Sequence, residues 1–181
     1  KNIYPKARLG DSTWLKFRAQ GLTDLIDLMN TTTHSYNKQS YLVQTWTARS
    51  DGSLFSSDVL RDNIGLDING ILNLTNSNKL DFFMAELMWQ QWAAEYGGTI
   101  FNPNWTKKAS LEFINLVNNR STPLIHVEIT PFLGTMGYVA PTLTEFSTTL
   151  QSIRDLNLGI DVYDYNQLIN HNAWDSLLSW N

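Results

Sequence analysis

The sequence predicts a single α/β domain over residues 1–181, built from repeated helix–strand units around a parallel sheet. A partial or distorted (β/α) barrel fits the same pattern. Three observations lead to this fold class. The length of 181 residues suits one domain, and 43% hydrophobic residues are enough for a sizeable core. In the second half, short apolar strands also alternate with segments of helical periodicity.

The first forty residues are expected to begin irregularly and then to form helix. Residues 1–12 contain chain breakers and no periodic pattern. Apolar residues over 14–29 recur at helical spacing with an interruption at Gly21, which predicts one helix broken at that glycine or two short helices. Asn30 and the three threonines after it are expected to end the helical pattern.

A strand is expected next, followed by a region with two open interpretations. Residues 41–47 are rich in aromatic and β-branched side chains and predict a strand, and residues 49–52 predict a turn. Over 64–74, Asn69 and Gly70 stand between apolar alternations, which is typical of a hairpin. A pair of short helical turns is the alternative.

The middle of the chain predicts two helices separated by a brief strand. Apolar side chains over 78–92 trace one face of a helix that Gly97 and Gly98 can close. Residues 99–101 predict the brief strand. The second helix is expected to start at Asn104 or Thr106 and to end near residue 119.

The last third predicts a parallel β–α–β unit and a final helix. Residues 123–129 form the first strand, whose apolar positions do not alternate, as expected for a strand covered on both faces. Thr142 and Glu145 fit a capping box at the start of a helix over 142–157. A second strand over 160–163 follows, with a right-handed crossover expected. Residues 166–180 predict the last helix.

Composition narrows the possible partners and the location. The net charge of −4 and the scattered basic residues disfavour nucleic acid. The absence of cysteine excludes disulfides, and no apolar run approaches the roughly 20 residues of a membrane span. A charged fraction of only 17%, with many uncharged polar residues, favours a secreted or cell-surface protein. Because the chain starts at Lys1, two interpretations stay open: a trimmed sequence, or a processed or C-terminal part of a longer protein that could associate with its other part.

The strongest candidate for chemistry is the pair His126 and Glu128 near the end of a predicted parallel strand. Ligands collect at the carboxyl ends of such strands, and residues two apart on a strand point to the same side. An imidazole and a carboxylate there can act as an acid–base pair or share a metal ion. The glycine-containing loop 130–138 suggests the rim of a site. The alternative is a structural strand whose polar side chains are satisfied by neighbours.

A second candidate is formed by Asp161 and Asp164 near the end of the following strand. Asp164 would stand at the edge of the same site, but the sequence favours a turn or helix-cap role for both residues. His34 is expected to be a loop histidine, because no other ligand accompanies it at metal-binding spacing. The many tryptophans and tyrosines are mostly core, with some available for stacking on sugar rings.

Three segments of the last 60 residues resemble the C-terminal end of the polysaccharide deacetylase family, over about a third of the chain. Pro-Leu-Ile-His-Val-Glu-Ile (123–129) is similar to that family's histidine strand. Residues 143–157 are similar to the next helix, and Gly-Ile-Asp-Val-Tyr-Asp-Tyr-Asn-Gln-Leu-Ile (159–169) to the final strand and helix. The resemblance implies a distorted (β/α) barrel with His126 as the site histidine. The family's Asp-Asp and paired-histidine metal motifs have no counterpart here.

Together these observations predict an extracellular carbohydrate-active domain of deacetylase-like or glycosidase-like barrel type. In it His126 acts as acid or base, Glu128 assists, and Asp164 lies at the site's edge. A divalent metal is expected only if deacetylase-like chemistry holds. The expected partner is a glycan or another cell-surface component. The alternatives are a non-catalytic structural or adhesive glycoprotein domain and a sugar-binding α/β module.

Overall fold

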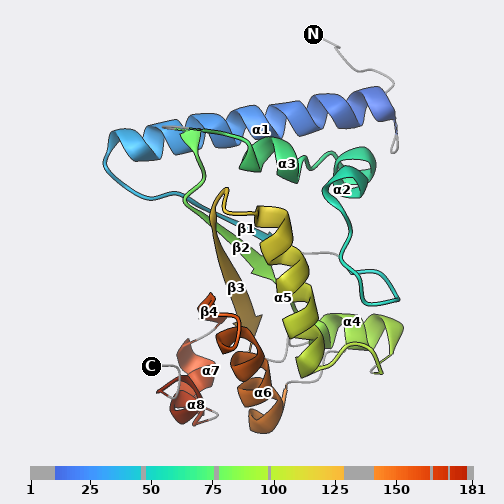
Figure 1. The fold of residues 1–181 in the computed structure, drawn as a ribbon, viewed down its shortest axis with the longest axis vertical. Helices are drawn as coiled ribbons and strands as arrows, with labels where there is room; N and C mark the ends of the chain where they lie inside the picture. Colours follow the sequence, from blue (N-terminus) through green and yellow to red (C-terminus); the bar gives the residue numbers. More distant parts are fainter. Residues whose placement is uncertain are drawn as a thin grey trace. The chain divides into compact units, whose positions relative to one another are not determined.

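The computed structural model describes residues 11–45, 48–75, 78–97, 99–128, 141–163, 165–170 and 172–178 (Figure 1). Its α/β architecture confirms the predicted fold class. A parallel sheet of four strands has the order β1 (Tyr41–Thr45), β2 (Phe82–Glu86), β3 (Thr122–Glu128) and β4 (Gly159–Tyr163). The strands follow one another in both chain and sheet with helices between them, which is also the arrangement of a (β/α) barrel segment. The barrel itself stays a prediction.

The chain divides into two compact units. Unit 1 contains residues 1–42, 55–82 and 119–121, and unit 2 contains residues 43–54, 83–118 and 122–181. The single domain expected from the sequence stays a prediction, because a division into compact units does not show whether each unit folds by itself.

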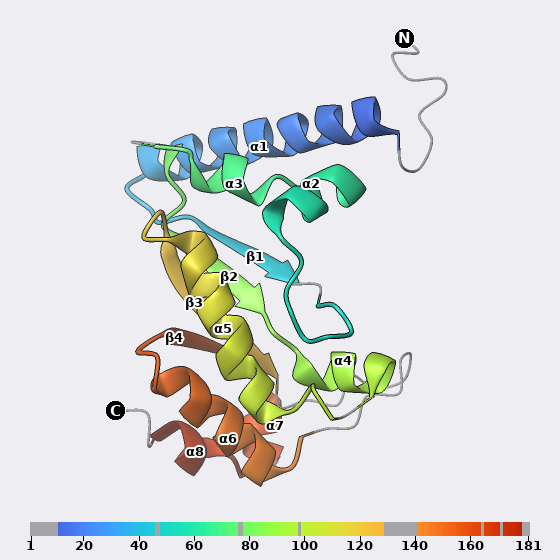
Figure 2. The ribbon, with the colours of Figure 1, turned by 45° about the vertical axis from the view of Figure 1, so that its right-hand side comes forward.

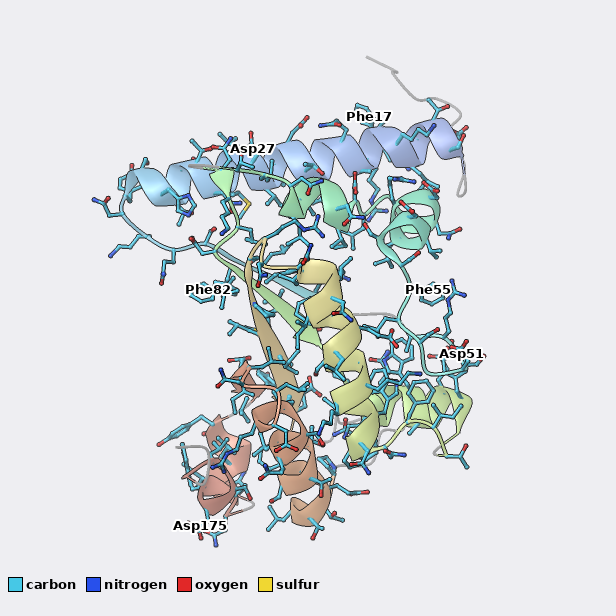
Figure 3. All side chains as sticks on the ribbon, in the orientation of Figure 1. Phe17, Asp27, Asp51, Phe55, Phe82 and Asp175 are labelled. Carbon is cyan, nitrogen blue, oxygen red and sulfur yellow. The ribbon has the colours of Figure 1, made fainter. Side chains whose placement is uncertain are left out.

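Unit 1 consists mainly of three helices that pack against one another (Figure 1): α1 (Ser12–Ser35), α2 (Ser57–Ile64) and α3 (Ile68–Leu72). The side chain of Asp11 caps α1 by accepting from the backbone N–H of Trp14 at 2.9 Å. Helix α1 contributes Leu15, Ala19 and Ile26 to the apolar core of this unit. Phe17 lies on the opposite side of α1 and is half exposed (Figure 3).

The predicted break in the first helix is wrong, because α1 runs without interruption through Gly21 to Ser35. The expected end at Asn30 is wrong for a tertiary reason. The Asn30 side chain is buried, and its amide donates to the backbone carbonyl of Asn78 at 2.8 Å. The hydroxyl of Thr31 donates to the Asn78 side chain at 2.7 Å. Partners distant in sequence therefore support helix where local propensity favours its end.

The ambiguous region 64–74 adopts the helical alternative and not the hairpin. Asn69 and Gly70 lie inside α3, where the Asp67 side chain accepts from the backbone N–H of Gly70 at 2.9 Å. The hydroxyl of Ser57 accepts from the backbone N–H of Asn69 at 3.0 Å. Two of the backbone N–H groups that the first turn of α3 leaves without helical partners therefore have side-chain acceptors.

The helix predicted over 78–92 is wrong, since this segment forms strand β2 and the start of α4 (Trp89–Tyr96). Three consecutive residues of β2 are buried, which is the pattern of a strand covered on both faces. A short apolar run of this kind fits helical and strand periods equally well. Phe83 packs edge-to-face on Phe113 of α5 (Pro103–Val117), with ring centroids 5.3 Å apart.

The brief strand expected at 99–101 is also wrong, because these residues form a turn that leads into α5. Phe101 is nevertheless part of the core, with its ring centroid 5.2 Å from that of Trp105. The Trp105 indole N–H donates to the carbonyl of Gly52 at 2.7 Å. The apolar character of the segment thus reflects burial and not strand pairing.

The predicted β–α–β unit is confirmed in unit 2, where β3 and β4 pair in parallel around α6 (Leu143–Arg154). The capping box is confirmed as well: Glu145 accepts from the backbone N–H of Thr142 at 2.7 Å and donates its own N–H to the Thr142 hydroxyl at 3.2 Å. Helices α5 and α6 pack on each other and on β3 (Figure 2). The final helix is divided into α7 (Tyr165–Asn170) and α8 (Trp174–Leu178).

Within the described ranges, no helix combines the length and the hydropathy needed to cross a bilayer.

Candidate functional site

The register of β3 and β4 determines which side chains meet. His126 pairs with Asp161 across the two strands, and Glu128 pairs with Tyr163. Since alternate residues of a strand point to the same side, these four side chains share one side of the sheet. The residue between them on β3, Val127, is buried. The polar side chains near the carboxyl end of β3 therefore lie opposite the apolar ones.

His126 is the most enclosed member of this group, with only 7% of the residue exposed. Its Nδ1 atom lies 2.5 Å from Oδ2 of Asp161, a short hydrogen bond. Its Nε2 atom lies 3.7 Å from Oε1 of Glu128, which is an ion-pair separation and too long for a hydrogen bond. The hydrogen bond to Asp161 therefore fixes the orientation of the ring. Nε2 makes no hydrogen bond to Glu128, so this nitrogen is the one that can contact a substrate.

The carboxylates around His126 favour its protonated form. Burial lowers the pKa of His126, but the nearby carboxylates of Glu128, Asp161 and Glu86 more than reverse this effect. The pKa of His126 is consequently raised above its ordinary value of 6.5. A histidine of this kind carries its proton over more of the neutral pH range and is suited to donate it.

Exposure differs sharply between the two strands that form the group. On β3, the side chains of His126 and Glu128 are 9% and 11% exposed. On β4, the Asp161 side chain is 49% exposed and Tyr163 is 50% exposed. The group is thus nearly closed at β3 and open to solvent at β4.

The structure places the predicted site residues as follows. His126 and Glu128 lie on one side of β3, as their spacing predicts. Asp161 is not the turn or cap residue that the sequence favoured, because it lies within β4 and binds the imidazole. Asp164 and the loop 130–138 lie outside the described residues.

Sequence reasoning missed Tyr163, a member of the group, and Glu86, whose charge acts on His126. Glu86 ends β2, but it was hidden because its segment was assigned to a helix. Tyr163 follows Asp161 by two positions on β4, so the same-side rule used for β3 would have found it.

His34 is not a loop residue, because it lies in the last turn of α1. Its Nε2 atom is 2.6 Å from Oδ2 of Asp81, and the same oxygen accepts from the backbone N–H of Ser40 at 2.8 Å. This second histidine–aspartate pair belongs to unit 1 and ties the end of α1 to the residues just before β1 and β2.

The divalent metal that deacetylase-like chemistry would require does not fit the residues seen here. Among those that the structure describes, no group of three or more His, Asp or Glu side chains could hold a metal ion. At His126, the hydrogen bond to Asp161 already occupies Nδ1.

Comparison with known proteins adds no family to this picture: no protein-family model matches the chain, and neither the curated proteins nor the solved structures contain a match.

Proposed function

We propose that this chain is an extracellular or cell-surface carbohydrate-active domain that hydrolyses a glycan, with His126 as the proton donor. One observation carries the proposal. A nearly buried imidazole is held by Asp161 at 2.5 Å, while its other nitrogen faces the carboxylate of Glu128. The resemblance of the last third of the chain to polysaccharide deacetylases also supports a role for His126.

The chemistry assigned to these residues is the hydrolysis of a glycosidic or ester bond. The imidazolium of His126 gives its Nε2 proton to the leaving oxygen as the carbon–oxygen bond breaks. A water molecule forms the new bond to carbon, and its proton passes to the Glu128 carboxylate. Transfer of that proton from Glu128 to His126 restores the starting state, so the net reaction adds one water. Asp161 acts as a positioning residue that holds the ring.

A second candidate function is a non-catalytic structural or adhesive domain. The observation that favours it is the low exposure of His126, at 7% of the residue. A buried histidine surrounded by carboxylates can have a purely structural role, in which its ion pairs join β3 to β4. Buried ionisable groups are usually paired in this way. The two candidates differ in whether His126 affects turnover.

The deciding experiment measures hydrolysis of acetylated xylan, acetylated chitooligosaccharides and 4-nitrophenyl glycosides, each with and without added Zn²⁺. For any substrate that is turned over, His126→Gln is expected to lower kcat by about 100-fold or more. His34→Gln is the matched control, because it removes the histidine of the other pair and should leave kcat unchanged. If the unchanged protein hydrolyses none of these substrates, or if His126→Gln retains full activity, the catalytic proposal fails and the structural candidate is favoured.

A further inference from the structure

We infer that Tyr163 is a stacking platform for a neutral pyranose ring beside His126, an inference that rests on the proposed function and specifies its substrate class. Tyr163 lies on the same side of the sheet as His126, and their ring centroids are 6.1 Å apart. It is half exposed, unlike the histidine. An exposed aromatic ring next to a nearly buried proton donor is placed to hold a substrate at that donor.

The geometry leaves surface on the Tyr163 ring for a ligand. Its plane is tilted by 40° from the imidazole plane, so the two rings are not stacked on each other. Along β4, Gly159, Asp161 and Tyr163 are exposed, whereas Ile160 and Val162 between them are less exposed. The side of β4 that carries Tyr163 is therefore open to solvent.

The chemistry of the neighbouring groups selects the ligand class. An aromatic face packs well against the C–H face of a pyranose ring, and the exposed Asp161 carboxylate can bind hydroxyl groups. The carboxylates of Glu128, Asp161 and Glu86 all act on His126. Their combined negative charge repels a sugar acid at the same place. We therefore expect neutral oligosaccharides to bind and oligouronides to bind weakly.

The test uses calorimetric titration of the full chain with three tetrasaccharides: cellotetraose, N-acetylchitotetraose and tetragalacturonate. Tyr163→Leu is expected to weaken binding of the neutral sugars by roughly tenfold, about 1.4 kcal/mol, since aromatic side chains at the centre of a binding site carry much of the binding energy. Tyr163→Phe keeps the ring and should bind as the unchanged protein does. Tyr41→Leu is the matched control, because Tyr41 is also an exposed strand tyrosine at 67%.

A second arm separates this inference from the proposed function. His126→Gln should lower kcat with little change in the dissociation constant, whereas Tyr163→Leu should act mainly on the dissociation constant and KM. If Tyr163→Leu binds the neutral sugars normally while His126→Gln is inactive, the platform is wrong and the catalytic role stands. If Tyr163→Leu loses binding while His126→Gln stays active, the platform stands and the catalytic role is wrong. The absence of saturable binding to all three probes, or a preference for tetragalacturonate, overturns the inference.

Discussion

The two histidine–aspartate pairs of this protein have nearly the same separation but opposite surroundings. In unit 1, Nε2 of His34 lies 2.6 Å from Asp81, and in unit 2, Nδ1 of His126 lies 2.5 Å from Asp161. Asp81 is the centre of its group, because it also accepts from the backbone N–H of Ser40 at 2.8 Å and from the Ser40 hydroxyl at 3.3 Å. In unit 2 the imidazole is the centre, and carboxylates surround it.

This difference decides which partner is electrostatically perturbed. Burial raises the pKa of Asp81, but the hydrogen bonds from His34 and Ser40 outweigh it, so that the pKa of Asp81 is lowered. Around His126 the effect of burial is outweighed by carboxylates, and it is the histidine whose pKa is raised. We interpret Asp81, a carboxylate with several donors, as a structural clamp. Under the proposed function His126 is a proton store, a group whose neighbouring carboxylates keep a proton on it for donation. The distance within a pair therefore does not reveal its role.

The largest expected effect that would sharpen this comparison is on catalysis. Asp161→Asn should lower kcat by about 100-fold, because an amide can present its N–H to the ring and stabilise the wrong tautomer. Asp81→Asn, the equivalent change in unit 1, should leave kcat unchanged. The measurement is the pH profile of turnover for any glycan substrate found: loss of Asp161 should also move the limb that reports His126 to lower pH. An unmoved profile would mean that Asp161 does not position the ring.

The next effect concerns stability. Here the change in the His34–Asp81 pair is expected to have the larger effect, whereas for catalysis it is the change in the His126–Asp161 pair. Asp81→Ala should lower the free energy of unfolding by about 2–3 kcal/mol, because it removes a charged acceptor that serves His34 and two groups of Ser40. Asp161→Ala should cost about 1 kcal/mol, since its side chain is 49% exposed and water replaces part of what is lost. Urea unfolding followed by circular dichroism measures both. A larger loss for Asp161 would contradict the division into clamp and proton store.

The sequence predicted much of unit 2 but less of unit 1 and of the site. The β–α–β unit was found because its signals are local: a capping box at Thr142 and apolar strands beside it. The extent of α1 was not found, because Asn30 is held in helix by a partner 48 residues away. The same limit applies to His34, whose aspartate lies 47 residues away. His126 and Glu128 were identified because their spacing within one strand places them together.

The role of Asp161 illustrates a contact that a single sequence does not reveal. Its distance from His126 along the chain is 35 residues, and only the register of two parallel strands brings them together. That register depends on packing of the whole unit. Strand β2 shows a related difficulty. It is buried on both faces, so its sequence lacks the alternation of apolar and polar residues that identifies a strand.

A third prediction uses pH, because the two groups should change stability in opposite directions. The raised pKa of His126 means that its contribution is complete below the unfolded value near 6.5 and is lost as pH rises through the folded value. The lowered pKa of Asp81 means that its contribution is present above 3.8 and is lost as pH falls through the folded value. Unfolding free energies from urea titrations between pH 3 and pH 9 should show both limbs. His126→Gln should reduce the slope of the upper limb only, and Asp81→Asn should reduce the slope of the lower limb only.

The smallest expected effect tests whether the proton store extends beyond β3 and β4. Glu86 acts on His126 only through its charge and ranks below Glu128 and Asp161 among the influences that raise the pKa of His126. Glu86→Gln should therefore lower that pKa by less than Asp161→Asn does, and the effect of Glu86→Gln should shrink in high salt because a longer-range interaction is more easily screened. The pKa of His126 is measured by NMR titration of its ring proton in the unchanged protein, in Glu86→Gln and in Asp161→Asn. The His34 resonance is the internal control. If Glu86→Gln leaves the His126 titration unchanged at low salt, the histidine is governed by β3 and β4 alone. Strand β2, which the sequence analysis assigned to a helix, would then have no part in the site.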